Sequence, residues 1–278
     1  MTGATASIVR RSRLPAELRA LPALLRVGFA QAIAYRAEFI VWVLAYTMPL
    51  IMLALWTAVA REGPVGRFDE KQFQAYFMTT LVVRVGTGAW VLWELNADIR
   101  FGVLSRRLLK PIHPLIGYAC EQVAAMPMRM LLISPIVGAT ALWLGVDILT
   151  DDPVQLAILP LALLGAWAMT FLVMASIASL AFFWESSLSV FDLWLGFYIV
   201  LSGYLMPLEL LPPAVRAATD WLPFRYMLSF PVENALGLLT REQALHALAV
   251  QWAWTAALVV ILLTTWRAGL RRFAAYGG

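Results

Sequence analysis

The sequence predicts an all-α polytopic membrane protein with six transmembrane helices. Hydrophobic residues make up 62% of the 278 residues, and charged residues only 14%. An average soluble domain carries about 25% charged residues. The apolar residues also fall in runs of about 20, long enough to cross a bilayer as a helix and without a polar face for water.

Each of the six runs is bounded by charged residues or by a cluster of Pro, Gly and Asp. The fifth run is the shortest and carries Asp192 near its start, so it could be longer or end in a re-entrant turn. The predicted spans are residues 39–60, 73–93, 117–144, 156–183, 190–206 and 245–265.

The distribution of Arg and Lys predicts that both termini are cytoplasmic, because cytoplasmic loops retain positive charge. Basic residues gather before span one, between spans two and three, and after span six, whereas the loops after spans one and three are balanced or acidic. We therefore expect a bacterial inner-membrane protein. Its expected parts are a cytoplasmic N-terminal segment (1–37), a six-helix domain (38–267) and a cytoplasmic tail (268–278).

An amphipathic helix is predicted before the first span, lying in the cytoplasmic interface of the membrane. Pro22 begins or kinks this helix. A helix that binds a soluble partner is the alternative. The apolar stripe, at three- and four-residue steps, is Leu18, Leu21, Leu25, Phe29 and Ile33.

The segment 207–243 is too long for a tight turn and contains too many prolines for a span. Its aromatic and aliphatic content keeps it near lipid. We expect two short re-entrant helices on the outer side, buried against protein so that their backbone groups are satisfied.

Common catalytic and metal-binding patterns are absent from the sequence. It contains no HExxH, no GxSxG and no Gly-Lys pair, which excludes a Walker A loop. Cys120 is the single cysteine, and His113 and His246 are far apart. We therefore expect no metal site and no catalytic residues in this chain. The basic residues flank apolar spans, which argues against nucleic acid as a partner.

Four ionisable residues within or beside the spans are candidate pathway residues, because a charge at mid-membrane is costly unless it faces protein or water. Arg84 and Arg129 lie near the middle of spans two and three. They could attract an anionic head group, or each could pair structurally with an acid such as Glu121 or Asp192.

The basic loop after span two, residues 94–114, mixes apolar and cationic residues and ends in Pro111 and Pro114. This pattern predicts a short amphipathic helix, at about 95–114, that fits a groove on a soluble partner. A helix lying on the lipid surface is the alternative.

Four segments in this order on six spans resemble the permease subunits of type-2 ABC exporters, over nearly the whole chain. The segments are YRAEF (35–39), IRFGVLSRRLLKPIHP (99–114), SGYLMPLELLPPAV (202–215) and RRFAAYGG (271–278).

The resemblance implies a cytoplasmic ABC ATPase dimer as partner, which binds ATP and Mg²⁺, and a second permease that is an identical or related chain. It further implies that the short helices after span five cap the exit side. Span two, or span five with Gly196 and Gly203, would lie at the dimer seam. The residues implied to contact the ATPase are Ile99, Arg100, Gly102, Leu108, Lys110 and Pro111.

The expected cargo is a hydrophobic or amphipathic compound, such as a drug, lipid, peptide or glycan intermediate. Two other classes stay open from the residues alone. One is a membrane enzyme acting on lipid head groups with Arg84, Arg129 and Glu121 at an interfacial site. The other is a scaffold that anchors a cytoplasmic partner without transport.

Overall fold

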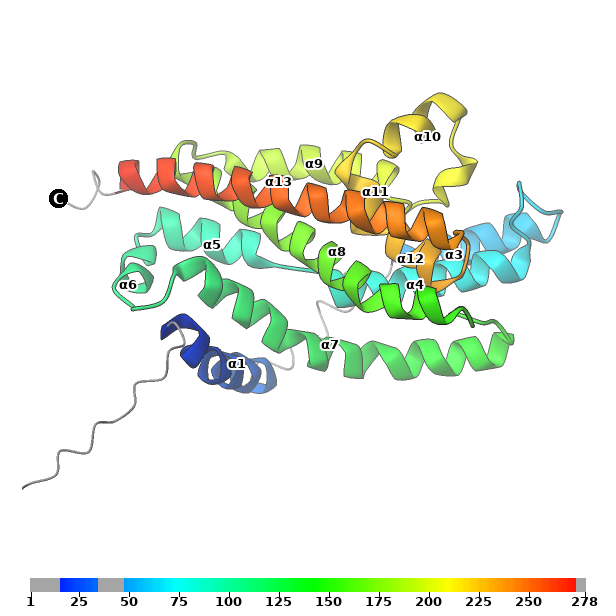
Figure 1. Ribbon diagram of the computed structural model, residues 1–278, viewed down its shortest axis with the longest axis horizontal. Helices are drawn as coiled ribbons and strands as arrows, with labels where there is room; N and C mark the ends of the chain where they lie inside the picture. Colours follow the sequence, from blue (N-terminus) through cyan, green and yellow to red (C-terminus); the bar gives the residue numbers. More distant parts are fainter. Residues whose placement is uncertain (1–15, 35–47, 274–278) are drawn as a thin grey trace, which may run out of the picture.

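The computed structural model describes residues 16–34 and 48–273, and helices dominate these residues (Figure 1). Four helical segments of the described residues are long and apolar enough to cross a membrane. They lie along the long axis of the molecule (Figure 1). These segments are Glu70–Arg100, Pro114–Leu144, Pro153–Phe182 and Arg241–Phe273. The prediction of an all-α membrane protein is confirmed at this level.

The first predicted span lies partly outside the described residues, and its described part is helix α3 (Met48–Ala60). Helix α3 packs against α4 (Glu70–Thr87), and an isolated bridge between Val65 and Phe68 shapes the connection. Asp69 caps α4 by accepting a hydrogen bond from the Gln72 backbone N–H at 2.8 Å. This capping box begins α4 three residues earlier than the apolar pattern predicts.

Span two is longer than predicted and is not one continuous helix. Helix α4 ends at Thr87, residues 88–90 are not helical, and α5 (Val91–Arg100) follows. Residues 94–100 therefore belong to the span, and the loop beyond them contains only the five-residue helix α6 (Leu104–Leu108). The expected amphipathic helix over 95–114 is thus divided between α5 and α6, at Gly102, whose φ is +72°.

Spans three and four match the predicted runs closely, whereas the helix of span six begins earlier and ends later than the predicted run 245–265. Helix α7 (Pro114–Leu144) contains Pro127 and Pro135, and α8 (Pro153–Ser179) continues into the 3-10 turn η1 (Leu180–Phe182). Helix α13 (Arg241–Phe273) is 33 residues long. Helix α9 (Ser187–Leu201) covers only 15 residues of the fifth run. Six spans therefore stay a prediction, because α3 and α9 are short.

Helix α1 (Ala16–Ala34) occupies the position of the predicted amphipathic helix and contains Pro22. It packs on α7 at the end of the molecule where α6 and the last turn of α13 lie, here called the basic end (Figure 1). Gly28 of α1 is buried against α7. A Cβ on Gly28 would come within 2.8 Å of the Ala124 Cβ. Phe29 and Leu25 of the predicted stripe remain exposed.

The segment after α9 forms a 3-10 turn and three short helices, where two helices were expected. They are η2 (Leu208–Leu210), α10 (Pro213–Thr219), α11 (Pro223–Met227) and α12 (Ser229–Ala235). All seven residues of α12 are buried, and α12 packs against α4 and α8. Whether the segment is re-entrant stays a prediction, but its innermost helix has the protein burial that such a segment requires.

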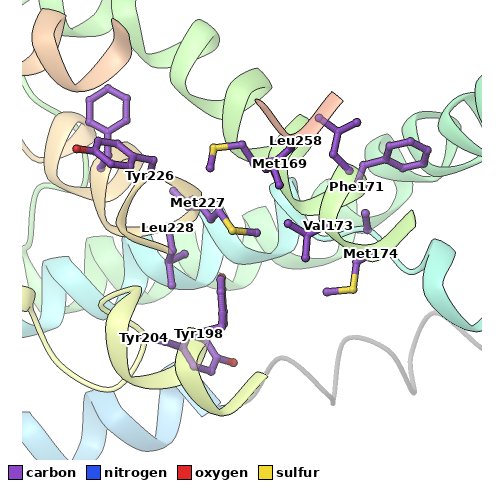
Figure 2. Close-up of a cluster of buried hydrophobic side chains, with 14 of the residues drawn as sticks. Met169, Phe171, Val173, Met174, Tyr198, Tyr204, Tyr226, Met227, Leu228 and Leu258 are labelled. Atoms are coloured by element: carbon purple, nitrogen blue, oxygen red, sulfur yellow. The ribbon is translucent and has the colours of Figure 1, made fainter. Parts of the chain in front are cut away.

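The part of the core drawn in Figure 2 joins α8, α9, α11 and α13, and the same core cluster extends to α4 and α5. Met169, Met227 and Leu258 lie within one buried cluster, with Tyr198 and Tyr204 at its edge. Gln251 of α13 is buried beside them and donates to the carbonyls of Ala162 (2.9 Å) and Tyr226 (2.8 Å). One amide thus connects three helices where an unpaired polar group would be costly.

Gly203 turns the chain out of α9 and provides a stability test. Its φ is +85°, and a Cβ would lie 2.6 Å from the Tyr76 hydroxyl. We expect Gly203→Ala to destabilise the purified protein by about 2 kcal/mol, because left-handed backbone and a close contact are both unfavourable for alanine. Thermal unfolding followed by tryptophan fluorescence measures the change.

Gly196→Ala is the matched control. Gly196 lies within α9 and has no atom within 4 Å of an added Cβ. Alanine should leave the melting temperature unchanged or raise it, since glycine is the poorer helix former. Equal melting temperatures for the two variants would contradict this account of the turn.

Candidate coupling site and the polar contacts that support it

The residues after span two are attached to spans two and three through one arginine. Arg107 of α6 binds Glu94 (2.5 Å) and Asp98 (2.9 Å) of α5, and Glu121 (2.8 Å) of α7. Its guanidinium also lies 4.1 Å from the ring centre of Tyr118. We call these five residues the Arg107 cluster.

Helical spacing explains how three carboxylates reach one cation. Glu94 and Asp98 are four residues apart and so share a face of α5. Tyr118 and Glu121, three residues apart on α7, face them, and the Tyr118 hydroxyl donates to Asp98 at 2.5 Å. A planar guanidinium with five N–H donors is suited to this arrangement, and an ammonium is not.

Arg107 stays positively charged in this environment. Burial lowers the pKa of its guanidinium, but the hydrogen bond and the charge of Glu121, with the charge of Glu94, raise it more, so the pKa lies above its ordinary value. The cluster therefore fixes α6 against both spans by partly buried ion pairs, which salt screens less than fully exposed pairs.

Beyond this anchor, residues 101–113 form an exposed surface, here called the coupling loop. Phe101 is 81% exposed and Leu109 is 87% exposed. Arg100, Arg106 and Lys110 are also exposed and lie close in the sequence to these two apolar residues. Leu104, on the inner side of α6, is fully buried.

Five of the six predicted contact residues lie on this surface or beside it. Arg100, Gly102, Leu108, Lys110 and Pro111 are exposed. Ile99 is 5% exposed and belongs to the hydrophobic core, so it supports the loop from within. Phe101 and Leu109, the most exposed apolar residues of the loop, are better placed for contact than Ile99.

Arg129 stabilises the non-helical break at residues 88–90 in span two. It is 3% exposed and donates to the carbonyls of Gly88 at 2.7 Å and of Gln122 at 2.9 Å. The Gln122 side chain in turn accepts from the Trp90 backbone N–H at 2.9 Å. Two side chains of α7 thus satisfy backbone groups of residues 88–90 that have left the helical pattern.

Arg84 lies in different surroundings, on the last turn of α4. Its guanidinium is 5.3 Å from the ring centre of Tyr198 and 5.9 Å from that of Tyr204. The aromatic faces stabilise a cation at this depth. Arg84 therefore connects span two to α9 and the turn that follows.

The two candidate acids also have separate positions. Glu121 belongs to the Arg107 cluster at the basic end. Asp192 is exposed on α9, next to the exposed Leu193 and four residues from Gly196. Glu121 and Arg129 thus have the structural partners described above, and Asp192 faces outward from the chain.

A cavity of about 940 Å³ lies at the opposite end of the molecule, between α10, α11, α12 and the first turns of α13. Its wall on α13 carries Glu242, His246, Val250 and Trp254, which repeat every four residues. Its wall thus combines charged, polar and aromatic side chains, which is typical of a ligand-binding cavity.

Three ion pairs lie in the lining of this cavity. Arg225 contacts Asp220 and binds Glu233 at 3.0 Å, and Ser229 donates to the same carboxylate at 2.7 Å. Arg67 binds Glu209 at 2.7 Å. Burial lowers the pKa of Arg225, but the charge and hydrogen bond of Glu233 raise it more, so the net pKa is raised and the pair stays charged.

Sequence reasoning did not identify Arg107 or the cavity residues as site residues. The spacing of Glu94 and Asp98 beside Arg107 was a visible signal for the cluster. The pairs of the cavity join residues from separate loops, such as Arg67 and Glu209, and no periodicity predicts them.

These features define a multi-pass membrane protein. It has long apolar helices, a span whose interrupted backbone is satisfied by buried polar groups, and an exposed basic loop. The profile of the ABC-2 family transporter proteins matches residues 44–277. The chain therefore belongs to the ABC-2 family, whose members are membrane permease components of ABC transporters and work with an ABC ATPase. A comparison with curated proteins gave no match.

Replacing Arg129 tests its structural role. In Arg129→Gln the shorter side chain cannot reach both carbonyls, and each buried group left unpaired costs about 1–3 kcal/mol. We expect a large loss of folded, monodisperse protein on size-exclusion chromatography. Arg100→Gln, at an exposed position, should express like the unmodified chain. Normal yield and stability of Arg129→Gln, with transport lost, would instead make Arg129 a pathway residue.

Proposed function

We propose that this chain is the transmembrane permease of an ATP-driven exporter, and that the coupling loop receives the movement of a cytoplasmic ABC ATPase dimer. Membership of the ABC-2 family supports the transport role. The observation that carries the proposal is the Arg107 cluster, which anchors an otherwise exposed loop to two spans.

The coupling loop has the surface that docking on a soluble subunit requires. Phe101 and Leu109 are apolar and highly exposed, and the exposed cations Arg100, Arg106 and Lys110 lie close to them in the sequence. An acidic groove with an apolar floor would complement this pattern. Because the loop is basic, it lies on the cytoplasmic side together with α1 and the end of α13.

Movement of the loop would reach the membrane through span two. Arg107 connects α6 to α5 and α7, so a displacement of α6 carries both helices with it. Residues 88–90 interrupt the helix between α5 and α4, and such a break is a natural hinge. In this mechanism ATP draws the ATPase subunits together, α5 tilts at the break, and the transport path opens outward.

The cavity of 940 Å³ would lie on the exit side, beneath the cap formed by α10–α12. Its closed state is stabilised by the ion pairs of Arg225 with Glu233 and of Arg67 with Glu209. Cargo that leaves the membrane would pass aromatic and charged side chains there. A hydrophobic or amphipathic compound, such as a drug, lipid, peptide or glycan intermediate, fits such a mixed wall.

The second permease, an identical or related chain, would pack on α9. Span two is largely buried within the chain, because 72% of its most apolar 18-residue stretch is buried by other parts of the protein. Gly203 is also buried, against Tyr76, so neither is available to a partner. Gly196 is open and lies on the same face as Asp192, whose carboxylate needs a polar partner in the membrane.

The coupling loop is tested with the full chain and its ATPase reconstituted in liposomes. Leu109→Asp places a carboxylate at the centre of the proposed contact. We expect cargo-dependent ATP turnover to fall about tenfold, which corresponds to the loss of one strong interface residue. The protein should fold normally, since Leu109 has few neighbours at 87% exposure.

Leu149→Asp is the matched control, because Leu149 is an exposed loop leucine near the opposite end. It should retain full turnover. Equal turnover for both variants would refute the docking role of the loop. A complex whose ATP turnover never responds to any transported compound would favour a scaffold over a permease.

A further inference from the structure

A second cavity, of about 400 Å³, lies between α1 and the spans at the basic end, far from the cavity beneath the cap. Its lining contains no charged residue. The residues come from α1, α7, α8 and α13, and they are Leu21, Leu25, Leu115, Ile116, Ala119, Cys120, Val123, Phe171, Leu172, Val259, Leu262 and Leu263. We call this cavity the α1 groove.

The close contact of Gly28 with Ala124 holds α1 against α7. One and two turns before this contact, Leu25 and Leu21 form one side of the groove, and α8 and α13 form the other. Helix α1 thus covers a space that its own side chains do not fill. The groove begins at Leu115 and Ile116, in the first turn of α7, and so reaches the end of the span.

The chemistry of the lining selects a hydrocarbon. Apolar cavities of about 150 Å³ stay dry and take up small hydrocarbons, so 400 Å³ has room for part of an acyl chain. In a membrane protein the surrounding medium supplies such chains. Lipid in the groove would restore the packing contacts that an empty space forfeits.

A cation at the groove selects the head group. On α13, Val259, Leu263 and Arg267 repeat every four residues, so they share one face, and Arg267 is exposed one turn beyond the groove. The wall formed by α13 therefore carries an arginine near the basic end, where a lipid phosphate would lie.

We propose that the α1 groove binds one acyl chain of an anionic phospholipid, with Arg267 at its phosphate. The lipid would then be a structural part of the contact between α1 and spans three, four and six. This inference requires only that the chain lies in a membrane, and it holds whether or not the coupling loop binds an ATPase.

Photocrosslinking of the full chain in phosphatidylcholine nanodiscs tests the proposal. The probes are a phosphatidylglycerol and a phosphatidylcholine, each with a diazirine in one acyl chain, and peptide mapping locates the crosslinks. We expect crosslinks on groove residues of α7 and α13, about fivefold more with phosphatidylglycerol, which is the effect of one basic residue near the lipid. Equal labelling by the two probes would mean ordinary boundary lipid and would overturn the proposal.

Two variants with matched controls separate chain binding from head-group binding. Ala119→Trp fills the groove and should abolish its crosslinks with both probes, whereas Ala139→Trp, at an exposed position of the same helix, should not. Arg267→Gln should reduce phosphatidylglycerol labelling to the phosphatidylcholine level, and Arg61→Gln, an exposed arginine at the opposite end, should leave it unchanged.

Arg267 is exposed, so its variant decides the question even where Ala119→Trp does not fold. Phosphatidylglycerol labelling that survives both Ala119→Trp and Arg267→Gln would place the lipid elsewhere and overturn the proposal.

Discussion

The structure depends on a line of polar side chains on α7 that faces span two. Tyr118, Glu121, Gln122 and Arg129 form this polar seam, and each binds a group that an apolar neighbour would leave unpaired. In lipid, backbone groups outside the helical pattern must be satisfied by protein. At residues 88–90, Gln122 and Arg129 of the seam satisfy these backbone groups. Two to three turns from Arg129, Glu121 and Tyr118 contact Arg107, the cation that anchors α6. One helix face thus supports both the break in span two and the loop that follows it.

This arrangement explains why the basic end combines rigidity with exposure. Partly buried ion pairs fix the base of the coupling loop, and its outer residues, Phe101 and Leu109, remain free of the chain. The opposite end follows the same rule, because Arg225 pairs with Glu233 inside a segment whose helix α12 is wholly buried. In both places charge is tolerated where several helices converge. The spans between them are packed mainly by apolar side chains.

The long helices could be predicted from the sequence, because about 20 apolar residues in a row leave few other structures open. Helix α7, for example, ends at Leu144 as predicted. The break at residues 88–90 was not predictable, since hydropathy averages over it and its partners, Gln122 and Arg129, are distant in sequence. The sequence predicted that Arg129 either lines a pathway or pairs structurally with an acid, whereas it binds two backbone carbonyls. Of the residues that the family resemblance implied for the ATPase contact, five are exposed and Ile99 is buried, and the contact itself stays a prediction.

The central claim is that the loop anchored by Arg107 faces the compartment that contains ATP. Leu109→Cys and Arg216→Cys, each with Cys120→Ala, place single thiols in the coupling loop and on the cap. A membrane-impermeant maleimide should label Leu109→Cys only in inside-out vesicles, and Arg216→Cys only in right-side-out vesicles. Labelling of Leu109→Cys from the outside, or of both thiols from one side, would contradict the account.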